Sequence, residues 1–203
     1  ATRGLRDWSD DLASLLRAIG IDRPVHLVGW SAGALAISHY AMEHGGVASL
    51  TYLCPVSPYG YGGTHRDGRP CFSDYAGTGA GGANPELVQR LRDGDTSADS
   101  PFSIRNVING LYWNPAFRNP QHREDLLVEE ILMTSIGDGV YPGDAATSTN
   151  WPGLAPGTTG MLNALSPKYA DWSGIVDLDP KPPILWTQGA QDQIISDSSP
   201  LEF

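Results

Sequence analysis

The sequence has few basic residues and no long apolar run. Lys and Arg together number 13 against 23 Asp and Glu in 203 residues, so the formal net charge is −10. This charge argues against binding to a nucleic-acid backbone or to an anionic membrane surface. No apolar run approaches the roughly 18 residues that a membrane-spanning helix needs. The composition therefore predicts an acidic globular protein without nucleic-acid or membrane partners.

Cysteine is scarce as well, because the chain contains only Cys54 and Cys71. Cys54 ends an apolar run and is expected to be a buried free thiol. A bridge to Cys71 is the alternative, and it would imply an oxidising compartment. No C-x-x-C or clustered histidine pattern indicates a metal site, and the glycine-rich stretch 77–82 lacks the lysine of a phosphate-binding loop. We therefore expect no metal or cofactor, and the compartment stays open.

The most informative stretch reads G-x-S-x-G and spans residues 29–33. It follows the apolar run 25–28 and precedes a second apolar run at 34–42, which predicts a strand, a sharp turn and a helix. In that context the turn presents the hydroxyl of Ser31, and the backbone amide of Ala32 faces a developing oxyanion. Gly29 and Gly33 would let strand and helix approach closely. An ordinary glycine turn is the alternative.

Residues 3–59 and 183–192 carry a resemblance to the α/β-hydrolases. The run D-W-S-D-D-L from Asp7 leads into L-V-G-W-S as it does in that superfamily, and P-I-L-W-T-Q-G-A-Q-D is similar to the turn that bears the catalytic acid. The resemblance implies an α/β fold with a mostly parallel sheet, helices on both faces and an inserted, largely helical cap. The implied domains are core at 1–59, cap at 60–180 and core again at 181–203.

Periodicity and capping residues predict the individual elements. Asp7, Asn84 and Asn119 are expected to cap helices. The expected helices are 7–19, 32–44, 85–92 and 120–135, and the expected strands are 25–28, 50–54 and 184–187.

A serine nucleophile needs a histidine base and an acid that orients it. Asp192 follows a core strand and is the expected acid, although a surface-turn aspartate is the alternative and Asp197 is a second choice. The superfamily order is serine, acid, histidine. All five histidines precede Asp192: His26, His39, His44, His65 and His122.

The triad histidine is therefore expected beyond residue 203. Flanking segments of the same hydrolase would supply it, together with the second oxyanion amide, and the isolated chain would be inactive and poorly stable. His26 is expected to be a packed strand residue, and His39 and His44 to lie on a solvated helix face. His65 or His122 could replace the missing base only in an unusual architecture.

The aromatic residues of the predicted cap suggest an apolar substrate pocket, although packing within the cap would also explain them. We expect Trp30, Tyr112, Trp113 and Trp151 to line it. Ser31 argues against dehalogenases and epoxide hydrolases, which carry aspartate at the elbow.

The expected function is hydrolysis of a carboxylic ester or lactone through an acyl-enzyme. Amide or peptide hydrolysis is the close alternative. A non-catalytic ligand-binding protein of the same fold, or a cofactor-free oxygenase or lyase, is the alternative from another class.

Overall fold

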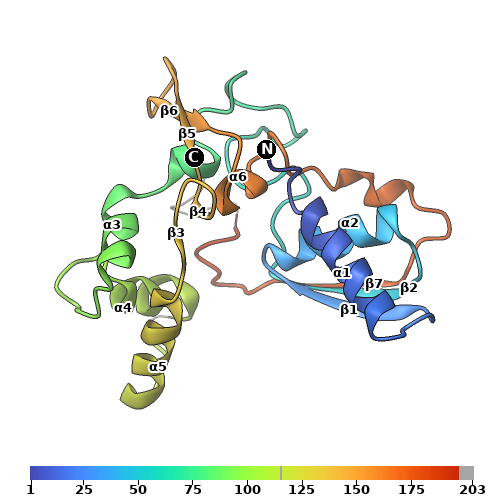
Figure 1. Ribbon diagram of the computed structural model, residues 1–203, viewed down its shortest axis with the longest axis horizontal. Coiled ribbons are helices and arrows are strands. Elements are labelled where there is room, and N and C mark those ends of the chain that lie inside the picture. The colour runs from blue at the N-terminus through green and yellow to red at the C-terminus, as the bar shows by residue number, and fades with distance from the viewer. Residues whose placement is uncertain (115, 197–203) are drawn as a thin grey trace.

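The computed structural model describes residues 1–114 and 116–196 (Figure 1). The helices are α1 (Arg6–Ala18), α2 (Gly33–Glu43), η1 (Gly79–Gly82), α3 (Pro85–Asp93), α4 (Ile104–Val107), η2 (Ile108–Tyr112), α5 (Gln121–Leu132), α6 (Met161–Leu165) and η3 (Ser173–Asp177). The strands are β1 (Val25–Trp30), β2 (Val47–Leu53), β3 (Ile136–Gly137), β4 (Tyr141–Pro142), β5 (Ala145–Thr147), β6 (Leu154–Pro156) and β7 (Ile184–Thr187).

The predicted elements are all present, with ends shifted by at most three residues, and β7 matches its predicted range at both ends. Asn84 caps α3 as predicted, because its side chain accepts from the amides of Glu86 and Leu87. The other two predicted caps are wrong. Asn119 precedes Pro120, which is the residue before α5 and has no side-chain cap. Asp7 lies inside the first turn of α1.

Three parallel strands form the main sheet in the order β1-β2-β7. Trp30 pairs with Leu53 and Leu53 with Thr187, so all three strands end at the same edge. Because the strands are parallel, whatever follows each of them emerges on that edge. The topology thus brings residues near 31, 54 and 188 together.

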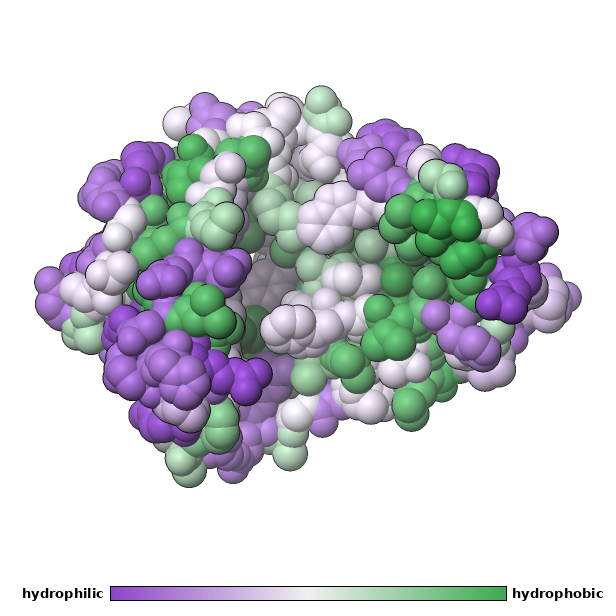
Figure 2. All heavy atoms as spheres, turned by 60° about the horizontal axis from the view of Figure 1, so that its bottom comes forward, coloured by the Kyte–Doolittle hydropathy of each residue, from purple (hydrophilic) through white to green (hydrophobic). Residues whose placement is uncertain are grey.

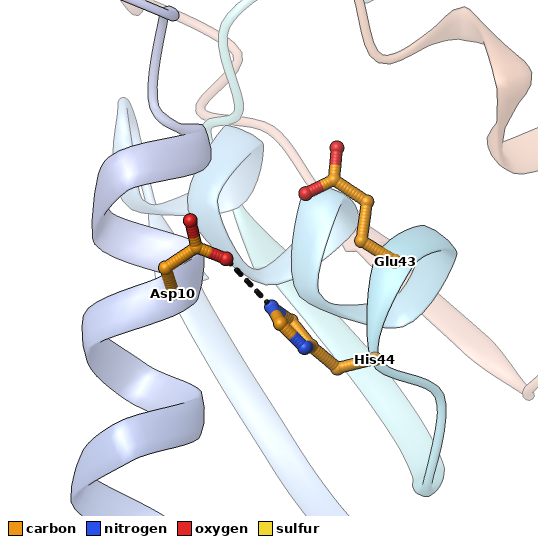
Figure 3. A group of neighbouring side chains, drawn as sticks. All are labelled: Asp10, Glu43 and His44. Atoms are coloured by element: carbon orange, nitrogen blue, oxygen red, sulfur yellow. Dashed lines mark hydrogen bonds and ion pairs between the residues drawn. The ribbon is translucent and has the colours of Figure 1, made fainter.

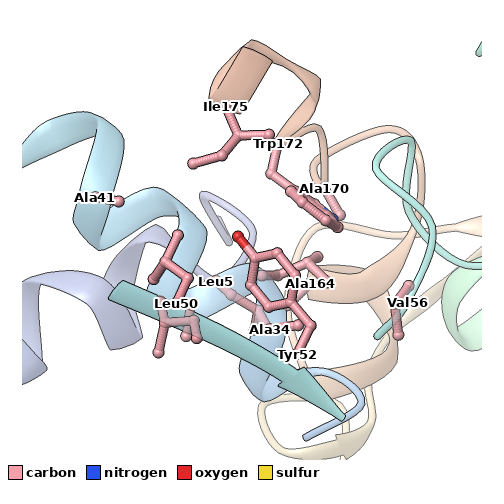
Figure 4. Packing of buried hydrophobic residues seen from close by; sticks show 13 residues of the cluster. Leu5, Ala34, Ala41, Leu50, Tyr52, Val56, Ala164, Ala170, Trp172 and Ile175 are labelled. Atoms are coloured by element: carbon pink, nitrogen blue, oxygen red, sulfur yellow. The ribbon is translucent and has the colours of Figure 1, made fainter. Parts of the chain in front are cut away.

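One face of the sheet packs on α2 and η3 around a single apolar cluster (Figure 4). Leu35, Leu50 and Tyr52 are fully buried there. Trp172 is also buried: its indole stacks on Trp186 at 6.2 Å, and its Nε1 donates to the carbonyl of Ser57 at 3.0 Å. An aromatic residue from the stretch predicted as cap therefore belongs to the core that supports the sheet.

The opposite face of the sheet is open in the part of the chain that the structure describes. Val28 and Leu185, which flank Thr51 in the register, are 64% and 59% exposed. The apolar stripe of α1 is likewise only partly covered, with Leu15 and Ile19 exposed. Figure 2 shows hydrophobic side chains gathered in patches on the surface it presents.

A second apolar cluster holds α3, α4, η2 and α5 together, away from the sheet (Figure 1). Its buried members are Leu91, Ile104, Ile108 and Val128. The side of this cluster carries the ion pair of Arg105 with Glu124 at 2.6 Å. The division into core and cap at residues 60 and 180 stays a prediction. None of the helices described is long and apolar enough to cross a membrane.

Candidate active site

Ser31 occupies a strained turn between β1 and α2. Its φ is +50°, in the left-handed region that residues other than glycine rarely adopt. Its amide donates to the carbonyl of Leu53 at 2.9 Å, and its carbonyl accepts from the amide of Ala34 at 3.1 Å. These two bonds fix the serine between the sheet and the helix. The predicted strand–turn–helix is therefore present, with a half-buried serine at its apex.

The two glycines of the motif differ in their surroundings. A Cβ on Gly29 would come within 2.6 Å of the Gly33 carbonyl oxygen and 2.7 Å of the Ala34 nitrogen. A Cβ on Gly33 would meet nothing within 4 Å. Close approach of strand and helix thus depends on Gly29 alone, and the expectation that Gly33 shares this role is wrong. The first residues of α2 lie directly against residue 29, whereas a side chain at position 33 would point into open space.

Ala32 directly precedes α2 and has helical backbone angles. Its amide donates no hydrogen bond to any residue that the structure describes. The first amides of a helix carry a partial positive charge and bind anions readily. The Ala32 amide is therefore available for a negatively charged oxygen beside Ser31.

Asp192 lies on the loop after β7, and both of its carboxylate oxygens are bonded. Oδ1 accepts from the amides of Ile194 and Ile195, both at 2.9 Å. Oδ2 accepts from the side-chain amide of Gln188 at 3.1 Å. The carboxylate is therefore held in one orientation by its own loop. The alternative acid, Asp197, lies outside the described residues.

Cys54 follows β2, between the strands that lead to Ser31 and Asp192. Its φ is +45°, and its amide donates to the carbonyl of Thr187 at 2.9 Å. Its sulfur lies beside Gly189 and Asp192. Burial raises the pKa of the thiol, and the neighbouring carboxylate raises it further. Both Cys54 and Cys71 are free, so the alternative of a bridge between them is wrong.

Ser31 and the Asp192 loop share one edge of the sheet, with β2 between them. Neighbouring strands lie about 4.8 Å apart, so the ends of β1 and β7 are about 10 Å apart. An imidazole that donates to Asp192 and accepts from Ser31 spans a gap of this order. Because β2 lies between β1 and β7, such an imidazole would lie above the end of β2.

The five histidines lie elsewhere. His26 shares a hydrogen bond with Ser49 at 2.7 Å near the start of β1, but it is exposed, so the expectation of a packed strand residue is wrong. His44 shares a hydrogen bond with Asp10 at 3.1 Å. His39 is fully buried in α2, which corrects the expectation of a solvated position. His65 and His122 are exposed. Within residues 1–114 and 116–196, no histidine is hydrogen-bonded to Ser31 or Asp192.

The aromatic residues expected at the pocket fall into separate groups. Tyr112 and Trp113 contact each other edge to face at 6.4 Å, and the Trp113 indole donates to the side chain of Asn109 at 3.2 Å. Trp30 and Trp151 are more than half exposed. Their contact with substrate stays a prediction.

A direct contact joins the segment after η2 to the acid loop. The side-chain amide of Asn114 donates to the side chain of Gln191, next to Asp192. Sequence reasoning did not find this bond, nor the bond from Gln188, because amide side chains on loops carry no periodic signal.

Asp10, Glu43 and His44 form a cluster with the composition of a metal site (Figure 3). Two arginines already neutralise its carboxylates: Arg3 lies 2.6 Å from Asp10, and Arg6 lies 2.8 Å from Glu43. The cluster is therefore better described as an ion-pair network that joins α1 to α2.

A comparison with protein families decides the identity of the fold, since residues 1–197 match the model of the alpha/beta hydrolase family. The chain belongs to the α/β hydrolase family. The expected fold class is thereby confirmed, and the Ser31 turn and the Asp192 loop lie on the carboxyl edge of its sheet.

Individual relatives are distant or cover part of the chain. A pimeloyl-[acyl-carrier protein] methyl ester esterase from Methylococcus capsulatus is 45% identical over 51 residues, which is 25% of this chain and 20% of that protein. The solved esterase from Exiguobacterium antarcticum has a TM-score of 0.52 at 15% identity, covering 97% of this chain and 59% of that one. The esterase RhEst1 from Rhodococcus sp. ECU1013 has a TM-score of 0.39 at 20% identity, covering 67% and 45%.

The α/β hydrolase chain thus spans less than two thirds of the length of the proteins it resembles. The likeness to the Exiguobacterium esterase extends over nearly all of this chain and supports the fold.

Proposed function

We propose that this chain forms part of a serine hydrolase that cleaves a carboxylic ester through an acyl-enzyme. One observation carries the proposal: Ser31 stands in left-handed backbone on the same sheet edge as Asp192, whose carboxylate is already oriented. A strained serine at a strand–helix turn, on the same sheet edge as an oriented acid, is an arrangement suited to nucleophilic catalysis.

In the proposed mechanism the Ser31 hydroxyl attacks the ester carbonyl while a histidine takes its proton. The amide of Ala32 donates to the oxyanion that develops. The histidine then gives its proton to the leaving alcohol, and water hydrolyses the acyl-enzyme by the same steps. Asp192 orients the imidazole and stabilises its charged form.

The ester class is supported by the relatives, since the Methylococcus protein and the Exiguobacterium protein are both esterases. A lactone is the cyclic form of the same bond and fits the same chemistry. An amide or peptide remains the alternative substrate, because the same acyl-enzyme forms from either bond.

We further propose that flanking segments of the same hydrolase supply the histidine and the second oxyanion amide. Two observations support this: the described histidines are engaged or placed elsewhere, and one face of the sheet leaves Val28 and Leu185 exposed. Burying such apolar side chains is worth about 1.5–3 kcal/mol each, so a covering segment would add substantial stability.

The proposed substrate is of medium size and largely apolar. Tyr112 and Trp113 are the best placed of the proposed pocket residues, because the adjacent Asn114 contacts the acid loop. Trp30 precedes the nucleophile in the chain, whereas Trp151 lies in the turn between β5 and β6.

The test is active-site labelling of the native protein with a fluorophosphonate, read by intact mass and peptide mapping. A single adduct on Ser31, absent in Ser31→Ala and slowed in Asp192→Asn, is the expected result. An unlabelled Ser31 in folded protein would contradict the proposal and favour a non-catalytic binding protein. Ester and amide substrates with the same acyl group then separate the two hydrolase alternatives.

A further inference from the structure

We propose that Gln188 is a positioning residue that fixes the orientation of Asp192 and thereby tunes the base. This inference rests on the proposed function, in which Asp192 is the triad acid. It assigns a role to a side chain that does not touch substrate or the reacting atoms.

The carboxylate of Asp192 is bonded asymmetrically. Oδ1 accepts two backbone amides, from Ile194 and Ile195, and is saturated by them. Oδ2 accepts from the side-chain amide of Gln188, and the Cys54 thiol interacts with the same carboxylate. A histidine N–H must approach the carboxylate between these neighbours, and Gln188 is the one that fixes the direction in which Oδ2 faces.

The Gln188 side chain is itself anchored at a second point. The same Nε2 that donates to Asp192 at 3.1 Å also donates to the carbonyl of Ile195 at 2.7 Å. The amide thus closes the loop from residue 188 to 195 around the carboxylate. Because Gln188 directly follows β7, this clamp ties the acid to the rigid end of a strand.

The surroundings of the clamp restrict the carboxylate further. Cys54 lies against Asp192 and Gly189, with its backbone bonded to Thr187 at the end of β7. Its thiol stays protonated at neutral pH because burial raises its pKa. Within the described residues, the carboxylate therefore has a neutral thiol and a neutral amide as neighbours.

The decisive variant is Gln188→Glu, made in the complete hydrolase that supplies the histidine. This variant keeps the shape of the side chain but removes the donor and adds a charge. A second carboxylate beside Oδ2 stabilises the protonated histidine. The acid limb of the kcat/KM profile should therefore move up by at least about half a pH unit. Gln188→Ala should lower kcat about ten-fold at nearly constant KM, because the acid loses its fixed orientation.

Gln191→Glu is the matched control. It makes the same charge change three residues away in the same loop, but the Gln191 side chain bonds Asn114 rather than Asp192. We expect the acid limb of the Gln191→Glu profile to shift by no more than about a third as many pH units as that of Gln188→Glu, because charge effects through solvent fall with distance. Thermal unfolding of each variant verifies that it is folded.

The outcomes separate this inference from the function beneath it. An unchanged profile in Gln188→Glu, or equal shifts in both glutamate variants, would overturn the role of Gln188. If turnover is too slow to measure, the rate of Ser31 labelling by a fluorophosphonate is measured against pH in its place. Turnover retained in Ser31→Ala would instead overturn the proposed function, whatever the Gln188 variants show.

Discussion

The Gly29 Cα lies so close to Gly33 that a methyl group at position 29 would come within 2.6 Å of the Gly33 carbonyl oxygen. Replacing Gly29 by Ala should therefore force the strand and the helix apart. We expect a loss of about 1–3 kcal/mol or more in the free energy of unfolding, together with loss of Ser31 labelling.

Gly33→Ala is the matched control, since its methyl group would enter open space. Chemical denaturation of both variants checks the pair. Equal losses for the two would show that residue 29 is not the point of close approach.

His39 should make folding sensitive to mild acid. The ring is fully buried and neither nitrogen has a hydrogen bond within the described residues. Burial lowers its pKa below 6.5, and Arg6 lowers it further against the opposing effect of Glu43 and Asp171. As the pH falls, His39 is therefore protonated in the unfolded chain before it is protonated in the folded one. The contribution of the neutral ring to stability is complete above pH 6.5 and is progressively lost below it.

Unfolding titrations at pH 7.5 and 5 would measure this loss. His39→Gln should reduce the difference in unfolding free energy between the two pH values. The same slope in His39→Gln as in the parent would assign the acid sensitivity to other groups.

Asp144 organises the turn that precedes α6. Its carboxylate accepts from the amides of Thr158 and Thr159 at 2.8 and 2.6 Å and from the side chain of Asn163 at 3.1 Å. The Thr159 amide bond is the largest cause that lowers the pKa of Asp144, to about 2. This stabilisation is complete above pH 3.8 and is lost as the pH falls from there toward 2.

Asp144→Asn should therefore lower the melting temperature at pH 7 and lose most of that difference near pH 2. Differential scanning calorimetry at the two pH values measures it. A constant difference between them would mean that ionisation of Asp144 plays no part.

The helices of the second cluster depend on the buried end of Glu124. Its carboxylate accepts from Arg105 at 2.6 Å and from Asn109 at 2.8 Å, and only 8% of the residue is exposed. Glu124→Ala should cost about 1–3 kcal/mol because it leaves these donors without their shared acceptor.

Asp125→Asn changes the exposed partner of the same arginine and should cost less than about 1 kcal/mol. Urea unfolding followed by near-UV circular dichroism compares the two. A larger loss for Asp125→Asn would place the main anchor of Arg105 at the surface.

The sequence predicted the elbow because its signal is local: an apolar run at 25–28, the G-x-S-x-G motif and a second apolar run at 34–42. It also predicted β7 and the placement of Asp192 after it. It could not predict the burial of His39 and Trp172, since the partners of both side chains are distant in the chain. The bonds of Gln188 and Asn114 were equally invisible, because loop geometry decides which amide reaches which carboxylate.

The central strand of the sheet, β2, separates the proposed nucleophile from the proposed acid and is hydrogen-bonded on both sides. Its amides should therefore exchange with deuterium more slowly than those of β1 and β7. The distance between Ser31 and Asp192 is then set by the strand that opens last. When the ends of β1 or β7 open transiently, β2 stays in place, and they can pair with it again in the same register.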